Sequence, residues 1–158
     1  MPDLPAPLPT WHLAQVNIAQ ALAPLDSPVM AGFVARIAEI NTLAESSPGY
    51  VWRFQDETGN ALYVRPYADP NVLFNLSVWQ TPDHLKAYVY RSGHVELMRQ
   101  KQQWFEHSDE AILALWWIPA GTLPSVDEAK ARLEHLRQHG PSAHAFGFRE
   151  IFPPPGQP

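Results

Sequence analysis

The fold is decided by the stretch VLFNLSVW at residues 72–79, in which side chains of different kinds alternate. Successive side chains of a β-strand point to opposite faces of its sheet. One face of this strand would be wholly apolar and carry Val72, Phe74, Leu76 and Val78. The opposite face would mix apolar and polar groups: Leu73, Asn75, Ser77 and Trp79. The stretch therefore predicts a strand with apolar surface on both faces.

A second strand, AILALWWI at residues 111–118, also places apolar side chains on both faces. A single layer of helices covers only one face of a sheet, so the other face needs a cover of its own. We expect a second copy of the chain to supply it, which predicts a homodimer packed sheet to sheet. The alternative is that the helix expected at residues 125–140, or a proline-rich arm, covers this face.

The remaining segments predict the order of elements. Strand-like alternation is expected in 11–19, 50–56 and, as a short last strand, 145–151. Capping residues and apolar periodicity predict a helix that begins at 26–28 and stops near SSPG at 46–49, and further helices over 81–93 and 125–140. A break at Ser92-Gly93 would separate the second helix from a further helical piece that carries His94. The order is β-α-β-β-α-β with an added C-terminal helix and edge strand, which predicts a ferredoxin-like α+β fold with an antiparallel sheet.

Proline marks the two ends of the expected domain. Residues 1–10 and 152–158 are rich in proline, which removes the backbone donors that regular structure needs. Both segments are expected to be extended arms. The length of 158 residues, with 46% apolar content, suits one domain, which we place at residues 11–151.

Composition excludes several classes of function. The net charge is −5 and no basic run is present, so nucleic acid is not an expected partner. Without cysteine, neither disulfides nor thiolate metal sites can form. The longest apolar run, at residues 111–120, is too short to span a membrane as a helix, and no export signal is evident. We expect a soluble, cytoplasmic protein.

His94 is the candidate catalytic residue, since a helical wheel places it with apolar residues. At about 100° per residue, Met98, Lys101 and Phe105 fall on the same side. Burial lowers the pKa of an imidazole and favours its neutral form, which can bind a metal or accept a proton. The alternative is a core histidine hydrogen-bonded to a backbone carbonyl or to Tyr88. Lys101 on this face could extend outward or pair with an acidic group of a ligand.

Other residues are candidates for the lining of a pocket near His94. Buried amides and hydroxyls need hydrogen bonds, so those of the strands either pair across the sheet or line an apolar pocket. Aromatic residues could form flat walls or simply pack. The lining is predicted to contain Asn17, Asn75, Trp79, Tyr88, Met98, Trp104 and Phe105.

The remaining chemical motifs are weak. His135 and His139 have the spacing of a metal-binding pair on a helix, but the apolar stripe points away from them and no third ligand is evident, so a solvated face is expected. The sequence has no H-E-x-x-H, glycine-rich phosphate loop or G-x-S-x-G motif. Common metalloprotease, nucleotide-binding and serine-hydrolase mechanisms are therefore not predicted.

Two stretches carry a resemblance to a known family. NLSVWQTPDHLKAYVYRSGHVELMRQKQQWF and LALWWIPAGTLPSVDEAKARLEHL resemble an uncharacterised bacterial family, domain of unknown function 3291. The resemblance implies a dimeric α/β barrel, in the superfamily of the antibiotic-biosynthesis monooxygenases. More distantly, the chain looks like the haem-dependent monooxygenase related to spheroidene oxidation. That resemblance implies haem as the cofactor, with His94 as the axial ligand of its iron.

These observations favour a small-molecule monooxygenase-like enzyme that acts on an apolar substrate in a pocket between sheet and helices. Haem bound through His94 is one form of this hypothesis. One alternative is a non-catalytic module that binds haem or another small ligand. Another is a dimeric interaction protein without a ligand. Turnover of a bound compound would separate the first two, and failure to retain any ligand would favour the third.

Overall fold

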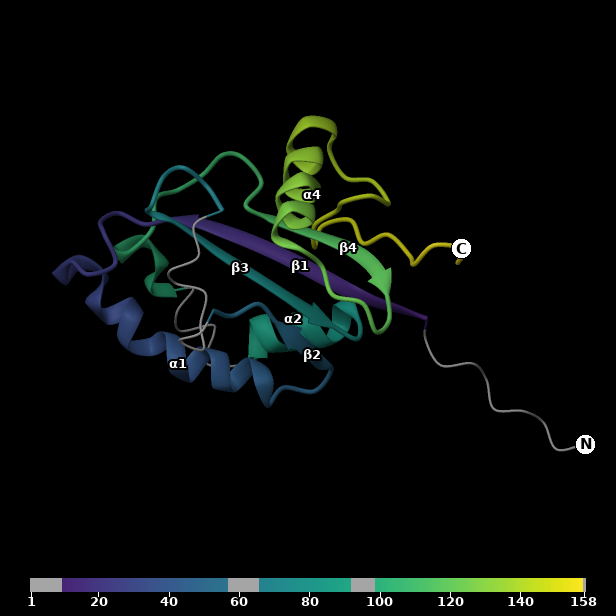
Figure 1. Ribbon diagram of the computed structural model, residues 1–158, viewed down its shortest axis with the longest axis horizontal. Helices are drawn as coiled ribbons and strands as arrows, with labels where there is room; N and C mark the ends of the chain where they lie inside the picture. Colours follow the sequence, from purple (N-terminus) through teal and green to yellow (C-terminus); the bar gives the residue numbers. More distant parts are fainter. Residues whose placement is uncertain (1–9, 57–65, 92–98, 158) are drawn as a thin grey trace, which may run out of the picture.

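A four-stranded antiparallel sheet forms the centre of the structure (Figure 1). The computed structural model describes residues 10–56, 66–91 and 99–157. The strands are β1 (Trp11–Gln20), β2 (Tyr50–Arg53), β3 (Val72–Trp79) and β4 (Leu113–Pro119), and their order in the sheet is β2-β3-β1-β4. This order, with one helix between β1 and β2 and another between β3 and β4, confirms the predicted ferredoxin-like α+β fold.

Three α-helices and two short 3-10 helices are described with the sheet. They are η1 (Pro28–Met30), α1 (Ala31–Glu45), α2 (Pro82–Arg91), η2 (Lys101–Gln103) and α4 (Val126–His139). Two α-helices begin at side chains that accept a hydrogen bond from a first-turn amide: Thr81 Oγ1 from His84 N at 3.2 Å, and Ser125 Oγ from Glu128 N at 3.1 Å. Because both capping residues can be recognised in the sequence, the starts of α2 and α4 were predicted correctly.

The helices lie on opposite faces of the sheet. Figure 1 shows α1 and α2 below the strands and α4 above them. Ala44 of α1 and Leu85 of α2 pack in one cluster with Leu13, Trp79 and Leu115 of the sheet. The other cluster joins α4 to the opposite sheet face and contains Ala14, Val16, Phe74, Leu76, Val78, Ala114, Trp116, Ile118, Ala129, Leu133 and Leu136. The sheet is thus the middle layer of three.

Helix α4 supplies the cover that the second sheet face needs. Ala129 and Leu133 are 0% and 1% exposed, and both pack against this face. The alternative considered for the second face, a cover from within the chain, is therefore what the structure shows. An uncovered face no longer argues for a dimer, and the homodimer stays a prediction.

Two predicted strands are shorter in the structure. The strand expected at 50–56 ends at Arg53, after a register shift between Tyr50 and Trp52, and one further bond joins Phe54 N to Leu76 O at 2.8 Å. The edge strand expected at 145–151 consists of a single bridge from Phe146 to Leu115. The chain then turns away from the sheet at residues 148–149, so no ladder can extend.

The helical piece expected to carry His94 is described only at its end, because residues 92–98 lie outside the described part. Residues 99–100 are helical and η2 follows. Trp104 N bonds to Lys101 O at 3.1 Å, and Phe105 then forms an antiparallel bridge with Ala21. The helix that the wheel assumed does not continue to Phe105, although Lys101 and Phe105 both line the cavity described below. Within the described ranges, no helix has the length and apolar character that crossing a membrane would require.

Candidate functional site

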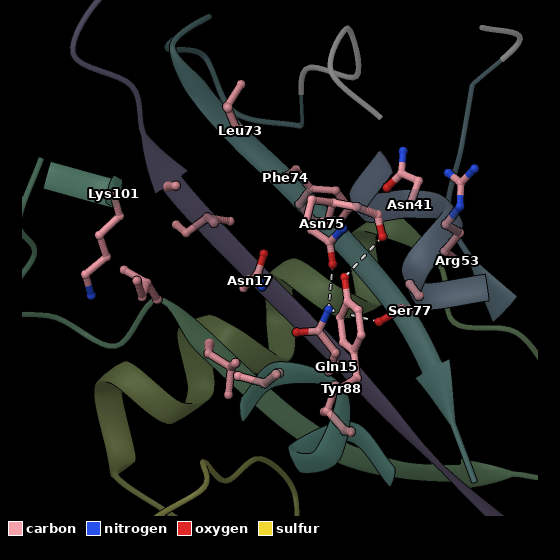
Figure 2. A pocket seen from close by; sticks show the side chains of 18 of the residues that line it. Gln15, Asn17, Asn41, Arg53, Leu73, Phe74, Asn75, Ser77, Tyr88 and Lys101 are labelled. Atoms are coloured by element: carbon pink, nitrogen blue, oxygen red, sulfur yellow. Dashed lines mark hydrogen bonds between the residues drawn. The ribbon is translucent and has the colours of Figure 1, made fainter. Parts of the chain in front are cut away.

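A cavity of about 380 Å³ lies between the sheet and helices α1 and α2, and Figure 2 shows it from close by. Its size falls within the range of pockets that bind small molecules. Most of its walls are apolar or aromatic: Ile18, Ala19, Phe33, Ile37, Ile40, Ala44, Leu73, Phe74, Trp79, Leu85, Tyr88, Val89, Tyr90, Phe105, Ile112, Leu113 and Phe148. The described polar groups of the lining are Gln15, Asn17, Asn41, Arg53, Asn75, Ser77 and Lys101.

The polar floor of this cavity comes from two neighbouring strands. β1 pairs with β3 so that Gln15 lies opposite Ser77 and Asn17 lies opposite Asn75. Because directly opposite residues share a face of the sheet, all four side chains point to the α1 and α2 side. Gln15 Nε2 donates to Asn75 Oδ1 at 2.7 Å and to Ser77 Oγ at 3.0 Å, as Figure 2 shows. The two alternatives left open by the sequence both hold, since these groups pair across strands and line a pocket.

Trp79 and Tyr88 form a flat aromatic wall beside the polar floor. Their rings stack with centroids 5.1 Å apart and planes 24° apart. Trp79 Nε1 donates to Ser77 Oγ at 3.0 Å, and the Tyr88 hydroxyl donates to Ile40 O at 3.4 Å. Burial raises the pKa of Tyr88 to about 12, against an opposing effect of the Arg53 guanidinium. Tyr88 is therefore a neutral hydrogen-bond donor at physiological pH.

Two cations stand at opposite ends of the polar floor. Arg53 is 9% exposed, and its Nε and Nη2 atoms each lie 2.8 Å from Glu45 Oε1 at the end of α1. Lys101 lies in η2 and is exposed. In Figure 2, Asn17, Gln15 and Asn75 lie between these two residues. The floor thus runs from a paired, buried guanidinium to an exposed ammonium.

The structure places the residues predicted for the site in three groups. Asn17, Asn75, Trp79, Tyr88 and Phe105 line the cavity. His94 and Met98 lie outside the described residues. Trp104 is not part of the described lining.

The prediction for Trp104 is corrected by its packing. Its indole is 5% exposed and packs with Ala21, Met30 and Ile40, of which Ile40 also lines the cavity. A β-carbon added to Gly32 of α1 would lie 3.4 Å from the indole ring, so the ring fills the space beside that glycine. Trp104 therefore holds η2 against α1.

Several lining residues escaped the sequence analysis. Arg53 is the one charged residue in the run YVWRF, and this break in an apolar strand was the available signal. Asn41 follows Ile40 on α1 and had no distinguishing pattern. Phe148 joins the lining from the C-terminal segment, where its ring meets Tyr90 with centroids 6.2 Å apart. Only the tertiary path of that segment reveals its role.

The described lining does not supply a ligand for haem. Haem iron takes an imidazole, thiolate, thioether or phenolate as its axial ligand. The described lining contains no histidine or methionine, and the chain has no cysteine. Tyr88 stays a neutral phenol because of its raised pKa, and Tyr90 is 57% exposed. In the described ranges no group of three or more histidine or acidic side chains could hold a metal ion either.

The histidines of α4 gather away from the cavity. His135 lies 4.6 Å from His139 and 4.5 Å from His144, measured between ring centroids. Arg132 Nη1 lies 3.0 Å from Nδ1 of His144 and donates to its backbone oxygen at 2.8 Å. Burial, then the charges of Arg132 and His135, lower the pKa of His144. The third imidazole was not foreseen, but the positive charge of Arg132, 3.0 Å from its Nδ1 atom, disfavours a bound cation there.

Fold and cavity together define the class of protein: a ferredoxin-like α+β domain with a pocket of ligand size under two of its helices. The chain belongs to the family described as domain of unknown function (DUF3291), whose model matches residues 12–158, and the predicted family is thereby confirmed. No curated protein matches the chain.

Solved structures of distant similarity accompany this family match. NE2512, a protein of unknown function from Nitrosomonas europaea, has 14% identity and a TM-score of 0.47 over 73% of this chain and 97% of its own. SnoaB from Streptomyces nogalater, a cofactor-independent oxygenase, has 15% identity and a TM-score of 0.44 over 72% of this chain and 98% of its own. Likeness at this level carries no argument about function.

Proposed function

We propose that this protein is a monooxygenase-like enzyme that oxidises a small, largely apolar molecule in the cavity between the sheet and helices α1 and α2. One observation carries the proposal. An apolar cavity of about 380 Å³ has a hydrogen-bonded floor of amide and hydroxyl groups, from Gln15, Asn75 and Ser77. Apolar walls bind by removing surface from water, and a few fixed polar groups orient what is bound.

The floor can stabilise negative charge on an oxygen of the substrate. Gln15 donates to Asn75 Oδ1, which leaves the Nδ2 amide hydrogens of Asn75 for the cavity. Ser77 Oγ accepts from both Gln15 and Trp79, so its own hydrogen is left to donate. Preorganised donors of this kind lower the energy of an oxyanion that forms against them. An enolate or phenolate is the species that this floor fits, and it would come from a substrate acidic enough to release its proton to water.

The Trp79–Tyr88 wall supports a flat substrate. Stacked rings present a planar apolar surface, and such surfaces favour other planar groups at about 0.5–1.5 kcal/mol beyond the area they bury. The neutral Tyr88 hydroxyl gives this wall a polar end. We therefore expect a substrate that contains at least one ring.

A second function, ligand binding without turnover, is favoured by one feature of the site. Among the described lining residues, none is a carboxylate or an imidazole, the groups that most often act as a general base. A carrier needs no base. The two functions differ in whether the bound compound is changed.

Oxygen uptake distinguishes these two functions. Ring-containing compounds that raise the thermal unfolding temperature are first selected, and each is then incubated with the protein in an oxygen-electrode cell. We expect uptake that scales with protein concentration and equals the product formed. Compounds that bind without any uptake under air would favour the carrier and contradict the enzyme.

Haem bound through His94 stays a prediction that rests on the sequence. The protein titrated with haemin is expected to give an intense Soret band with a defined stoichiometry, and His94→Ala is expected to weaken or shift it, because the axial ligand would be lost. His139→Ala, on the surface of α4, is the matched control. Identical spectra for the protein and His94→Ala would remove His94 as the ligand, and no binding by either would exclude haem.

A further inference from the structure

The described lining of the cavity carries positive charge but no negative charge. Its charged residues are Arg53 and Lys101, and it includes no aspartate or glutamate. The whole chain has 16 acidic and 11 basic residues, with a net charge of −5. A lining with this sign, in a chain of the opposite sign, attracts anions to one place while the rest of the surface repels them.

The two cations differ in what neutralises them. Arg53 is held by Glu45, and a pair of this kind leaves little net charge for a ligand. Lys101 has no hydrogen bond or ion pair from its ammonium to any residue of the described chain. Lys101 lines the same cavity as the apolar Phe105. A flexible lysine beside apolar surface gains most from a ligand that brings an anionic group to the same end.

The floor between Lys101 and Arg53 also offers donors, with Ser77 opposite Arg53 in the register of β2 and β3. Asn75 presents amide hydrogens because its oxygen is used by Gln15, and Ser77 has its hydroxyl hydrogen left because both of its acceptor positions are used. Donors and an ammonium together match a ligand rich in oxygen acceptors. They do not match a cationic ligand.

We propose that the ligand of this cavity is an organic anion, with an apolar, ring-containing body and one carboxylate that pairs with Lys101. The ring lies against the Trp79–Tyr88 wall, and the carboxylate lies at the opposite end from Arg53. This proposal rests on the proposed function, because it assumes that the cavity holds a small molecule. Lys101 is a binding residue in it and takes no part in bond making.

A matched pair of probes tests the charge alone. Naphthalene-2-carboxylate and naphthalene-2-carboxamide have nearly the same shape, and only the first is charged at neutral pH. Isothermal titration calorimetry is expected to show the carboxylate binding about tenfold more tightly than the amide, as a charge-assisted hydrogen bond implies. Raising the salt concentration should weaken the binding of the carboxylate and leave the binding of the amide unchanged.

The variant Lys101→Met removes the ammonium and keeps an apolar stem of similar length. This variant should bind the carboxylate about tenfold more weakly, and its affinity for the amide should change by less than about twofold. Lys86→Met, on α2 outside the described lining, removes the same charge and should leave the affinity for both probes unchanged. Equal affinities for both probes, unaltered by Lys101→Met, would overturn the anionic ligand and leave the proposed function standing. If neither probe binds, both proposals fail.

Discussion

Replacing Trp116 with alanine is expected to lower the free energy of unfolding by about 3–5 kcal/mol. Trp116 is 0% exposed and sits in the cluster between β4 and α4. Its Nε1 donates to Glu128 Oε1 at 3.0 Å, and Arg132 lies over its ring at 5.9 Å. Removing the indole leaves a large void between sheet and helix. It also removes the contacts that Glu128 and Arg132 of α4 make with the ring.

Urea unfolding followed by circular dichroism measures this loss. A domain of this size is stable by only about 5–15 kcal/mol, so the variant should unfold at a much lower urea concentration. Trp116→Phe keeps most of the apolar volume and should lose about 1–2 kcal/mol. Leu123→Ala, at a residue that is 58% exposed, should change stability by less than about 0.5 kcal/mol. If Trp116→Ala were no worse than Leu123→Ala, α4 would not be part of the core.

The fold was predictable where local chemistry and periodicity agreed. VLFNLSVW places apolar residues at every second position, and β3 occupies those residues, 72–79. Ser125 predicted the start of α4, because its side chain accepts a hydrogen bond from an amide only three residues further on. What covers the Phe74 and Trp116 face was not predictable, because the apolar pattern says only that a face is buried. A helix of the same chain and a second copy satisfy that pattern equally well.

The site was predictable only in part, for a related reason. Period two put Asn75 and Ser77 on one face of β3, but their bonding to Gln15 depends on the register between two strands 60 residues apart in the sequence. Trp104 was predicted for the lining but is not part of it as described, and the bridge between Phe105 and Ala21 ends the helical geometry next to it. Tertiary pairing thus decided which aromatic residue reached the cavity.

Replacing Asn75 with phenylalanine is expected to weaken ligand binding by at least about 100-fold while the domain stays folded. Asn75 is exposed on the middle of β3 and faces the cavity. A benzyl group there would take up space that the ligand needs, and the apolar walls around it would accept it. Aromatic residues are also well suited to strands. The loss in stability should stay near 1 kcal/mol, because one hydrogen bond with Gln15 is lost while its bond to Ser77 remains.

Calorimetry with naphthalene-2-carboxylate and thermal unfolding measure the two effects separately. Asn75→Ala is the matched control, since it removes the same amide without filling the cavity. Its affinity should fall only about tenfold, the contribution of one or two hydrogen bonds. Leu123→Phe adds the same ring at an exposed site beyond the cavity and should leave affinity unchanged. Because the added ring takes up space that the substrate needs, Asn75→Phe should abolish oxygen uptake as well, and a variant that still turned over its substrate would place the reaction elsewhere in the protein.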